Sequence, residues 1–299
     1  MKKFLKWLGI VLSALLGFVV IVLAVFYFKG SAALGRTHTI APESISIPSD
    51  AASIARGEHF VKAICVDCHS ADLSGKMLLD APFAKIYSAN LTGGKGGAGA
   101  EFTDADFVRA LRHGVDNKGR DLVLMPAQVF WNFNDQDLGD VIAYIKSLPP
   151  VDSEHPDPQI NALGHIMIGA GMFGAGIVPA NVIAHEQRPP VVPIGVTAPY
   201  GEYLVNVTGC HDCHGAQLAG GKSAKPGALD APNLTPGGEL RAWTDAQFLQ
   251  TIRTGVTPSA HALNPAEMPW KSFNSYSDDE LKAIFLYLQS LPALPTVKP

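Results

Sequence analysis

The chain has 299 residues, of which 47% are hydrophobic and 17% charged, and its formal net charge is −4. This balance provides no basic surface for nucleic acid, and no block of like charges marks a disordered tail. The length suits two small domains with connecting segments better than one large core.

Residues 1–29 are predicted to form a membrane anchor. The apolar run Leu8–Phe28 would span about 30 Å at about 1.5 Å per residue. A cleaved signal peptide has a shorter apolar core of roughly 7–15 residues, although Ser31-Ala32-Ala33 leaves cleavage open. The lysines before the run predict a cytoplasmic N-terminus. We therefore expect a single-pass protein of the inner (cytoplasmic) membrane whose remaining residues lie in the periplasm or on the outer face of the membrane.

Residues 30–49 contain Pro42 and Pro48 and are expected to be a tether. If this segment is flexible, about 20 residues would have a reach of roughly 25 Å. A tethered domain would then swing towards a neighbouring membrane complex.

The rest of the chain repeats itself. Asn90-Leu91-Thr92 recurs as Asn233-Leu234-Thr235, and Ser147-Leu148-Pro149 recurs as Ser290-Leu291-Pro292. Other matching segments keep nearly the same separation, which indicates two copies of one domain. We place the first copy at residues 50–150 and the second at 196–299.

Each copy is predicted to be all-α. Thr103 and Thr244 are expected N-caps of a middle helix, and Ser277 with Glu280 forms a capping box for the last helix of copy two. The last helix of copy one is expected to start near Asn134. A short helix leads into each cysteine pair, over Gly57–Ile64 and Gly201–Gly209.

Residues 151–195 connect the copies and include the apolar, glycine-rich stretch Ile160–Ala184. A second transmembrane span is the alternative, but Pro179 and His165 disfavour it, and both copies must lie on one side of the membrane. We expect an inter-domain strap that packs over both copies, with Met167 and Met172 buried in it.

All four cysteines fall in one pattern that occurs twice, at Cys65-Val66-Asp67-Cys68-His69 and at Cys210-His211-Asp212-Cys213-His214. Cys-x-x-Cys-His is the attachment signature of c-type haem, in which both thiols form thioethers and the histidine ligates the iron. A pair of disulfides, a zinc site or a redox dithiol are the alternatives. None of them explains a histidine directly after both pairs.

The sixth iron ligand is expected from Met125 and Met268, which occupy equivalent positions and are both followed by proline. A thioether favours Fe(II), so this ligation raises the reduction potential. The alternative is that both methionines only pack in the core. We expect Met77 to pack as well.

Other chemically capable side chains are not expected to bind iron. Arg112 and Arg253 match across the copies, and they either neutralise haem propionates or form surface ion pairs. The histidines without a ligand role are His59, His113, His211 and His261.

With these motifs the chain resembles tandem class I cytochromes c, in particular the cytochrome subunits of membrane-bound alcohol and sugar-acid dehydrogenases. The resemblance covers residues 50–150 and 196–292. It implies two covalently bound haem c groups with His69 and His214 as proximal ligands and Met125 and Met268 as distal ligands. It also implies that a backbone carbonyl near each Asn-Leu-Thr segment accepts a hydrogen bond from the proximal imidazole. Copy two has Pro232 before Asn233, whereas copy one has Ala89 at that place.

We therefore expect an electron carrier rather than an enzyme. Its donor would be a periplasmic dehydrogenase or a quinol-oxidising complex of the respiratory chain, and its acceptor a terminal oxidase or a soluble cytochrome. One alternative is a fixed electron-transfer subunit of a membrane complex. Another is a di-haem peroxidase, which needs one iron with an open site.

Overall fold

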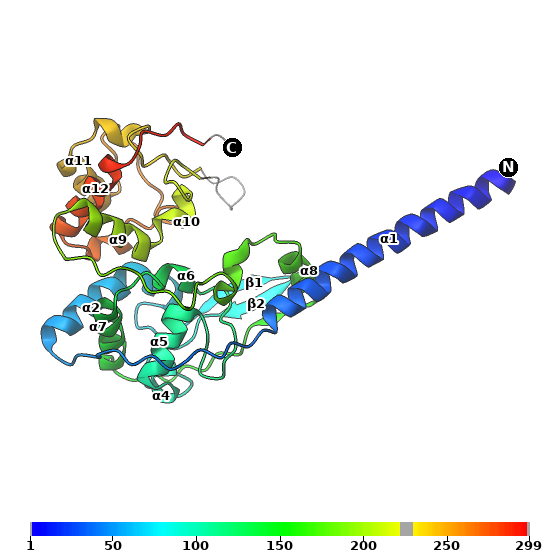
Figure 1. The fold of residues 1–299 in the computed structure, drawn as a ribbon, viewed down its shortest axis with the longest axis horizontal. Helices are drawn as coiled ribbons and strands as arrows, with labels where there is room; N and C mark the ends of the chain where they lie inside the picture. Colours follow the sequence, from blue (N-terminus) through cyan, green and yellow to red (C-terminus); the bar gives the residue numbers. More distant parts are fainter. Residues whose placement is uncertain (1, 222–229, 298–299) are drawn as a thin grey trace.

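The computed structural model describes residues 2–221 and 230–297. The helix α1 (Lys2–Leu34) projects from a body that the two repeats form together (Figure 1). Among the described residues, α1 is the helix that is long and apolar enough to cross a membrane, and its apolar window is not buried by the rest of the chain. The helix continues past the expected boundary at residue 29, because Ser31-Ala32-Ala33-Leu34 is compatible with helix.

Both repeats are mostly helical, as predicted. Copy one contains α2 (Ala51–Ile64), α3 (Val66–His69), α4 (Ala98–Glu101), α5 (Asp104–His113), α6 (Ala127–Phe130) and α7 (Asp135–Ser147). Copy two contains α9 (Ala198–Thr208), α10 (Cys210–His214), η3 (Glu239–Ala242), α11 (Asp245–Thr254), η4 (Ser272–Ser275) and α12 (Asp278–Ser290).

The first and last helices of each repeat cross at a glycine. A Cβ added to Gly57 of α2 would lie 1.9 Å from the carbonyl oxygen of Asp140 in α7. A Cβ added to Gly201 of α9 would lie 1.9 Å from the carbonyl oxygen of Ala283 in α12. The two repeats therefore share the same close crossing of their first and last helices.

The expected helix caps are present. The side chains of Thr103, Thr244 and Ser277 each accept a hydrogen bond from the N3 backbone amide of α5, α11 and α12, in complete capping boxes. Asn134 caps α7 in the same way, through the amide of Asp137. These caps satisfy amides that a helix start leaves unpaired.

Copy one also contains a small sheet, which the sequence analysis did not predict. Strand β1 (Met77–Ala81) pairs with β2 (Ala84–Tyr87), and β2 pairs with β3 (Gln159–Ile160), both in antiparallel fashion. The expectation that Met77 packs is wrong, because its side chain is 44% exposed on β1.

The segment after α1 is fastened to copy one, so the expectation of a swinging tether is wrong. The amide of His38 donates to the carbonyl of Gly119 at 2.9 Å, and Ile45 and Ile47 pack against the core. Glu43 contacts the buried Arg112 at 2.7 Å and His113 at 2.6 Å. These contacts hold residues 37–47 on the surface of copy one.

The connecting strap also differs from the expectation that it packs over both copies. It contains α8 (Ala162–Gly169), η1 (Ala175–Ile177) and η2 (Pro179–Asn181). Helix α8 lies along the C-terminal end of α1 (Figure 1). The short helix η2 packs against α6. Met172 is 66% exposed rather than buried. The strap thus connects copy one with the C-terminal end of α1.

The two repeats meet face to face through equivalent elements. α2 of copy one packs against η4 of copy two, and α9 of copy two packs against α6 of copy one. Because α2 corresponds to α9 and α6 corresponds to the region of η4, the interface has an approximate two-fold relation. Buried residues of both repeats form one continuous hydrophobic cluster across it.

Candidate functional site

Each Cys-x-x-Cys-His segment forms one helical turn at the end of the first helix of its domain. The amide of His69 donates to the carbonyl of Cys65 at 2.9 Å, directly after α2. In copy two, Gly209 adopts φ +76° between α9 and α10, a left-handed conformation that suits glycine. Because one turn holds both cysteines and the histidine, their side chains are positioned by the same short element.

The cysteines are all free thiols, so the structure does not support the disulfide alternative. Burial raises the pKa of Cys65 and of Cys210 to about 12. Such thiols are not activated for dithiol exchange, which needs a thiolate. In residues 2–221 and 230–297, no three His, Cys, Asp or Glu side chains are grouped so that they could hold a metal ion.

The two histidines of the motifs have the same hydrogen-bond partner in each repeat. His69 Nδ1 lies 2.8 Å from the carbonyl oxygen of Ala89, and His214 Nδ1 lies 2.8 Å from that of Pro232. A carbonyl only accepts, so Nδ1 carries the proton and Nε2 is left free to act as a ligand. Burial lowers the pKa of both histidines, which favours the neutral form. The carbonyl acceptor that the resemblance implied is thus present in both repeats.

The Asn-Leu-Thr segments hold these carbonyls in place. Asn90 Nδ2 donates to the carbonyl of Val151 at 2.7 Å, and its Oδ1 accepts from the amide of Thr92 at 2.9 Å. Asn233 makes the same pair of bonds, to the carbonyl of Leu294 and from the amide of Thr235, both at 2.8 Å. In each repeat the asparagine side chain therefore fixes the position of the preceding residue, Ala89 or Pro232, relative to the segment that follows the last helix.

Met125 and Met268 lie at equivalent tight turns. The amide of Ala127 donates to the carbonyl of Met125 at 2.8 Å, and the amide of Trp270 donates to that of Met268 at 2.7 Å. Both methionine side chains are half-buried against the hydrophobic core. The turns that carry the expected distal ligands thus have the same local geometry in the two repeats.

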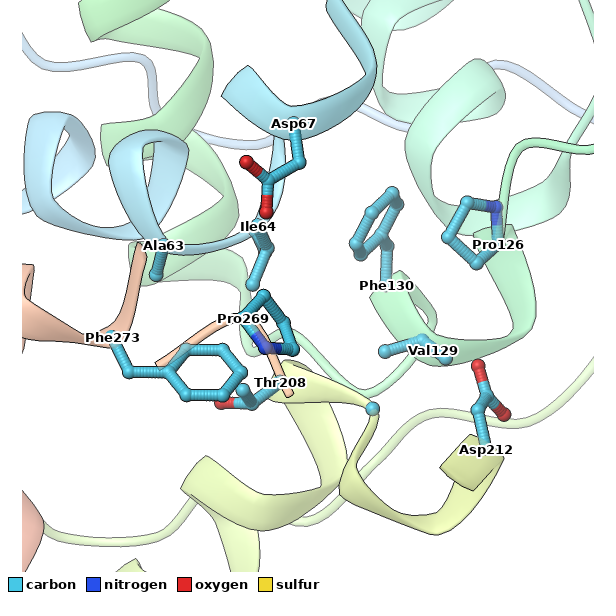
Figure 2. Close-up of a pocket in the computed structure, with 11 residues that line it drawn as sticks. Ala63, Ile64, Asp67, Pro126, Val129, Phe130, Thr208, Asp212, Pro269 and Phe273 are labelled. Atoms are coloured by element: carbon cyan, nitrogen blue, oxygen red, sulfur yellow. The ribbon is translucent and has the colours of Figure 1, made fainter. Parts of the chain in front are cut away.

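A cavity of about 140 Å³ lies where the two repeats meet, and equivalent residues of both repeats line it (Figure 2). The second of the two residues between the cysteines of each motif, Asp67 or Asp212, borders it, as does the proline after each methionine, Pro126 or Pro269. Ser272 Oγ donates to Asp67 Oδ2 at 2.9 Å across this interface. The structure therefore brings both haem-attachment turns and both Met-Pro turns to one place.

Polar pairs at equivalent positions connect the repeats beside this cavity. Tyr203 Oη donates to Asp137 Oδ2 at 2.5 Å, and His59 Nε2 lies 3.1 Å from Glu280 Oε1. Asp137 and Glu280 both occupy the N3 position of the last helix of their domain. The sequence analysis missed these pairs, although the equivalence of the two acids was a detectable signal.

The matched arginines support the helix starts. Arg112 donates to the carbonyl of Phe133 and to Asp135. Arg253 donates to the equivalent carbonyl of Tyr276 and to Asp278. This geometry favours the ion-pair alternative over a role at the propionates.

The remaining histidines have partners away from the Cys-x-x-Cys-His turns or are exposed. His113 contacts Glu43 and His185, and His211 Nε2 lies 3.1 Å from Asn206 Oδ1. His261 is exposed.

The donor set of each repeat fits a covalently attached haem. Each turn offers two free thiols and an imidazole, and in the described part of the chain Nδ1 is the only ring nitrogen of His69 and His214 with a hydrogen-bond partner. The first thiol of each turn, that of Cys65 or Cys210, packs in or against the hydrophobic core, and the second, that of Cys68 or Cys213, is exposed.

Two protein-family models match the chain, one in each repeat. The model described as cytochrome c matches residues 54–149, and the model described as cytochrome C oxidase, cbb3-type, subunit III matches residues 197–288. Both matches fall within the two repeats, so each repeat is a cytochrome c domain. Such domains carry covalently bound haem c.

Several relatives extend over both repeats. The fructose dehydrogenase cytochrome subunit of Gluconobacter japonicus is 31% identical over 266 residues, which cover 81% of this chain and 53% of the relative. The cytochrome c subunit of the quinone-dependent alcohol dehydrogenase of Gluconobacter oxydans is 28% identical over 300 residues, which cover 91% of this chain and 61% of the relative. The gluconate 2-dehydrogenase cytochrome c subunit of Pantoea cypripedii is 29% identical over 274 residues, covering 81% and 60%.

The chain thus spans somewhat more than half the length of these relatives. Their names describe cytochrome subunits of dehydrogenases, which favours an electron carrier over an enzyme. The resemblance drawn from the motifs is confirmed. The chain contains two cytochrome c domains in tandem and is a homologue of the cytochrome c subunits of dehydrogenases.

Proposed function

We propose that this chain is a membrane-anchored di-haem cytochrome c that transfers electrons from a dehydrogenase or a quinol-oxidising complex to a terminal oxidase or a soluble cytochrome. The observation that carries the proposal is the cavity bordered by both Cys-x-x-Cys-His turns and both Met-Pro turns. A carrier with two sites gains from such proximity, whereas two independent binding domains would not need it.

In this proposal the residues of each repeat have separate roles. Cys65 and Cys68 attach one haem, and Cys210 and Cys213 attach the second. His69 and His214 ligate through Nε2, with their orientation fixed by the carbonyls of Ala89 and Pro232. Met125 and Met268 supply the opposite ligands. When bound, haem iron supplies a reversible one-electron change.

The surrounding chain keeps each site from rearranging. The Asn-Leu-Thr networks fix the carbonyl that orients each imidazole. The cross-domain pairs of Asp137 with Tyr203 and of Glu280 with His59 hold the two domains at one separation. A rigid environment lowers the cost of reorganisation when charge changes, because few dipoles have to move.

The proposed topology rests on α1. The lysines at its start favour a cytoplasmic N-terminus, so α1 would cross the inner membrane and both domains would lie in the periplasm. The alternative of a removed signal peptide is disfavoured by the contacts of α1 with α8, since a segment destined for removal needs no packing partner.

A gene deletion tests the proposed function. Membranes of the source organism without the gene are expected to lose oxygen uptake with one class of substrate among alcohols, sugars and sugar acids. The wild-type gene should restore uptake, and C65A/C68A and C210A/C213A variants should not. Unchanged uptake with every donor would refute the proposal.

A fixed subunit of a dehydrogenase complex is the second candidate, and the names of the relatives favour it. Purification in mild detergent separates the two. A stable stoichiometric complex supports a fixed subunit, whereas an isolated chain supports a mobile carrier.

A further inference from the structure

The apolar middle of the strap, Ile160–Ala184, presents an uncharged surface. Residues 160–184 contain no Asp, Glu, Lys or Arg. Even so, Leu163 is 50% exposed, Met172 is 66% exposed and Phe173 is 38% exposed. Several exposed apolar side chains on one short uncharged segment indicate a surface that another phase or molecule covers.

The strap is fixed to the membrane helix by close backbone packing. A Cβ added to Gly30 of α1 would lie 1.9 Å from the carbonyl oxygen of His165, and one added to Gly169 would lie 1.9 Å from that of Phe26. Ser31 Oγ and His165 Nδ1 lie 2.9 Å apart. Small residues permit such close helix crossings, so α8 is held beside α1 in one orientation.

The hairpin of copy one joins the same surface. Asn161 donates from its backbone amide to the carbonyl of Phe83 at 3.2 Å, and from Nδ2 to the carbonyl of Pro82 at 2.7 Å. The rings of Phe83 and Phe173 lie 5.5 Å apart. We call Phe83, Leu163, Met172 and Phe173 the strap patch.

The level of the strap patch along α1 is set by the contacts of α8. These contacts fall at Phe26–Ser31, where the apolar run Leu8–Phe28 ends. If the run fills the hydrocarbon core, about 30 Å thick, α8 lies where α1 leaves the membrane. In Figure 1, α8 and the hairpin lie on the side of the body from which α1 extends.

We propose that the strap patch rests on the lipid surface, with its apolar side chains at the boundary between headgroups and acyl chains. The proposal rests on the membrane-spanning role of α1 given above. The four side chains of the patch are uncharged, and α8 packs beside α1 at the end of its apolar run, which suits a lipid interface rather than a polar protein surface. Copy one is then held in one orientation to the membrane, by the strap on one side and by the segment 37–47 on another.

Spin labels in nanodiscs test this placement in the full, haem-loaded chain. Leu163→Cys and Met172→Cys carry the label at the strap patch, and Leu286→Cys carries it at an equally apolar position of copy two that is 43% exposed. Val19→Cys labels the middle of α1. Unmutated protein treated with the label gives the background from the native cysteines.

Collision rates with oxygen and with a water-soluble nickel complex give the depth of each label. We expect the oxygen-to-nickel ratio at positions 163 and 172 to be several-fold higher than at position 286. A ratio equal to that at position 286 would place the patch in water and overturn the proposal. Low rates with both reagents would mean that protein covers the patch, which also overturns it.

The label at position 19 distinguishes a failure of the strap placement from a failure of the proposed membrane-spanning role of α1. A high oxygen-to-nickel ratio there with a low ratio at positions 163 and 172 refutes the strap placement and leaves the anchor intact. A low ratio at position 19 refutes the anchor, and the strap placement with it.

Discussion

Replacement of Tyr203 by phenylalanine tests the coupling of the two domains. Tyr203 Oη donates to Asp137 Oδ2 at 2.5 Å and accepts from Asn134 Nδ2 at 3.1 Å. Asp137 is 2% exposed, so water cannot replace the lost hydroxyl. A hydrogen bond to a charged group contributes about 1.5–3 kcal/mol. We expect Y203F to lose about 2 kcal/mol of unfolding free energy, which is about 30-fold in the equilibrium constant.

The loss should depend on pH. Burial raises the pKa of Asp137 above its ordinary value of 3.8. A raised pKa means that this carboxyl stabilises the fold below its unfolded pKa, and that the stabilisation is lost as the pH rises through the folded pKa. The hydroxyl donor offsets part of that loss, because it stabilises the carboxylate. The penalty of Y203F should therefore be larger at neutral pH than at acid pH.

Urea unfolding, followed by absorbance of the haem and by circular dichroism, measures the penalty. Y200F is the matched control, because the hydroxyl of Tyr200 lies 3.5 Å from Glu280, the limit of a hydrogen bond. A double-mutant cycle of Y203F with D137N isolates the pair energy. If Y203F costs no more than Y200F, the pair does not hold the domains together.

Three further changes test other parts of the structure. G201A should lower the unfolding free energy by about 1–3 kcal/mol in urea titrations, because its Cβ would overlap the carbonyl of Ala283. E43Q should raise hydrogen exchange of residues 37–47. Acid should also raise this exchange. Burial raises the pKa of Glu43, but hydrogen bonds from His113 and Arg112 outweigh burial, so the net pKa is lowered. The stabilisation by Glu43 is therefore full above about pH 4.5 and is lost as the pH falls through the lowered pKa. Burial lowers the pKa of His113 from 6.5, so protonation of His113 on acidification also destabilises the fold, beginning at a higher pH than protonation of Glu43. M268L should abolish half of the methionine–iron charge-transfer band in the absorption spectrum.

Each change has a control within the chain. G195A introduces a Cβ whose nearest neighbour is 3.8 Å away, so it should leave stability unchanged. E186Q removes an exposed carboxyl of the strap and should leave exchange of residues 37–47 as it is. M172L replaces an exposed methionine and should keep the full band. Equal effects of a change and its control would contradict the assigned role.

The helical part of the fold follows from local signals that the sequence displays. Thr103 and Thr244 start helices because a hydroxyl next to three free amides is a local interaction, and repetition of the motif doubles the signal. The haem-attachment turns are likewise continuous in sequence. The equivalence of Arg112 and Arg253 was visible in the sequence. The role of these arginines was not, because each one binds the start of a helix that is distant in the chain.

The rest of the structure depends on contacts between distant residues. The third strand of the sheet, β3, comes from residues 159–160, so its pairing with β2 is not visible in the segment 77–87. Residues 37–47 looked like a free tether, because Glu43 finds Arg112 and His113 only in the folded domain. The strap was expected to pack over both repeats, because its apolar composition indicates packing against another apolar surface. Composition alone does not identify that surface.

The central claim is that two porphyrins are bound covalently at Cys65/Cys68 and at Cys210/Cys213. Mass spectrometry of the denatured chain, together with its pyridine haemochrome spectrum, measures this directly. We predict the mass of the polypeptide plus two haems, and the loss of one haem in each of C65A/C68A and C210A/C213A. A denatured chain with no porphyrin mass and no haemochrome absorbance would contradict the account.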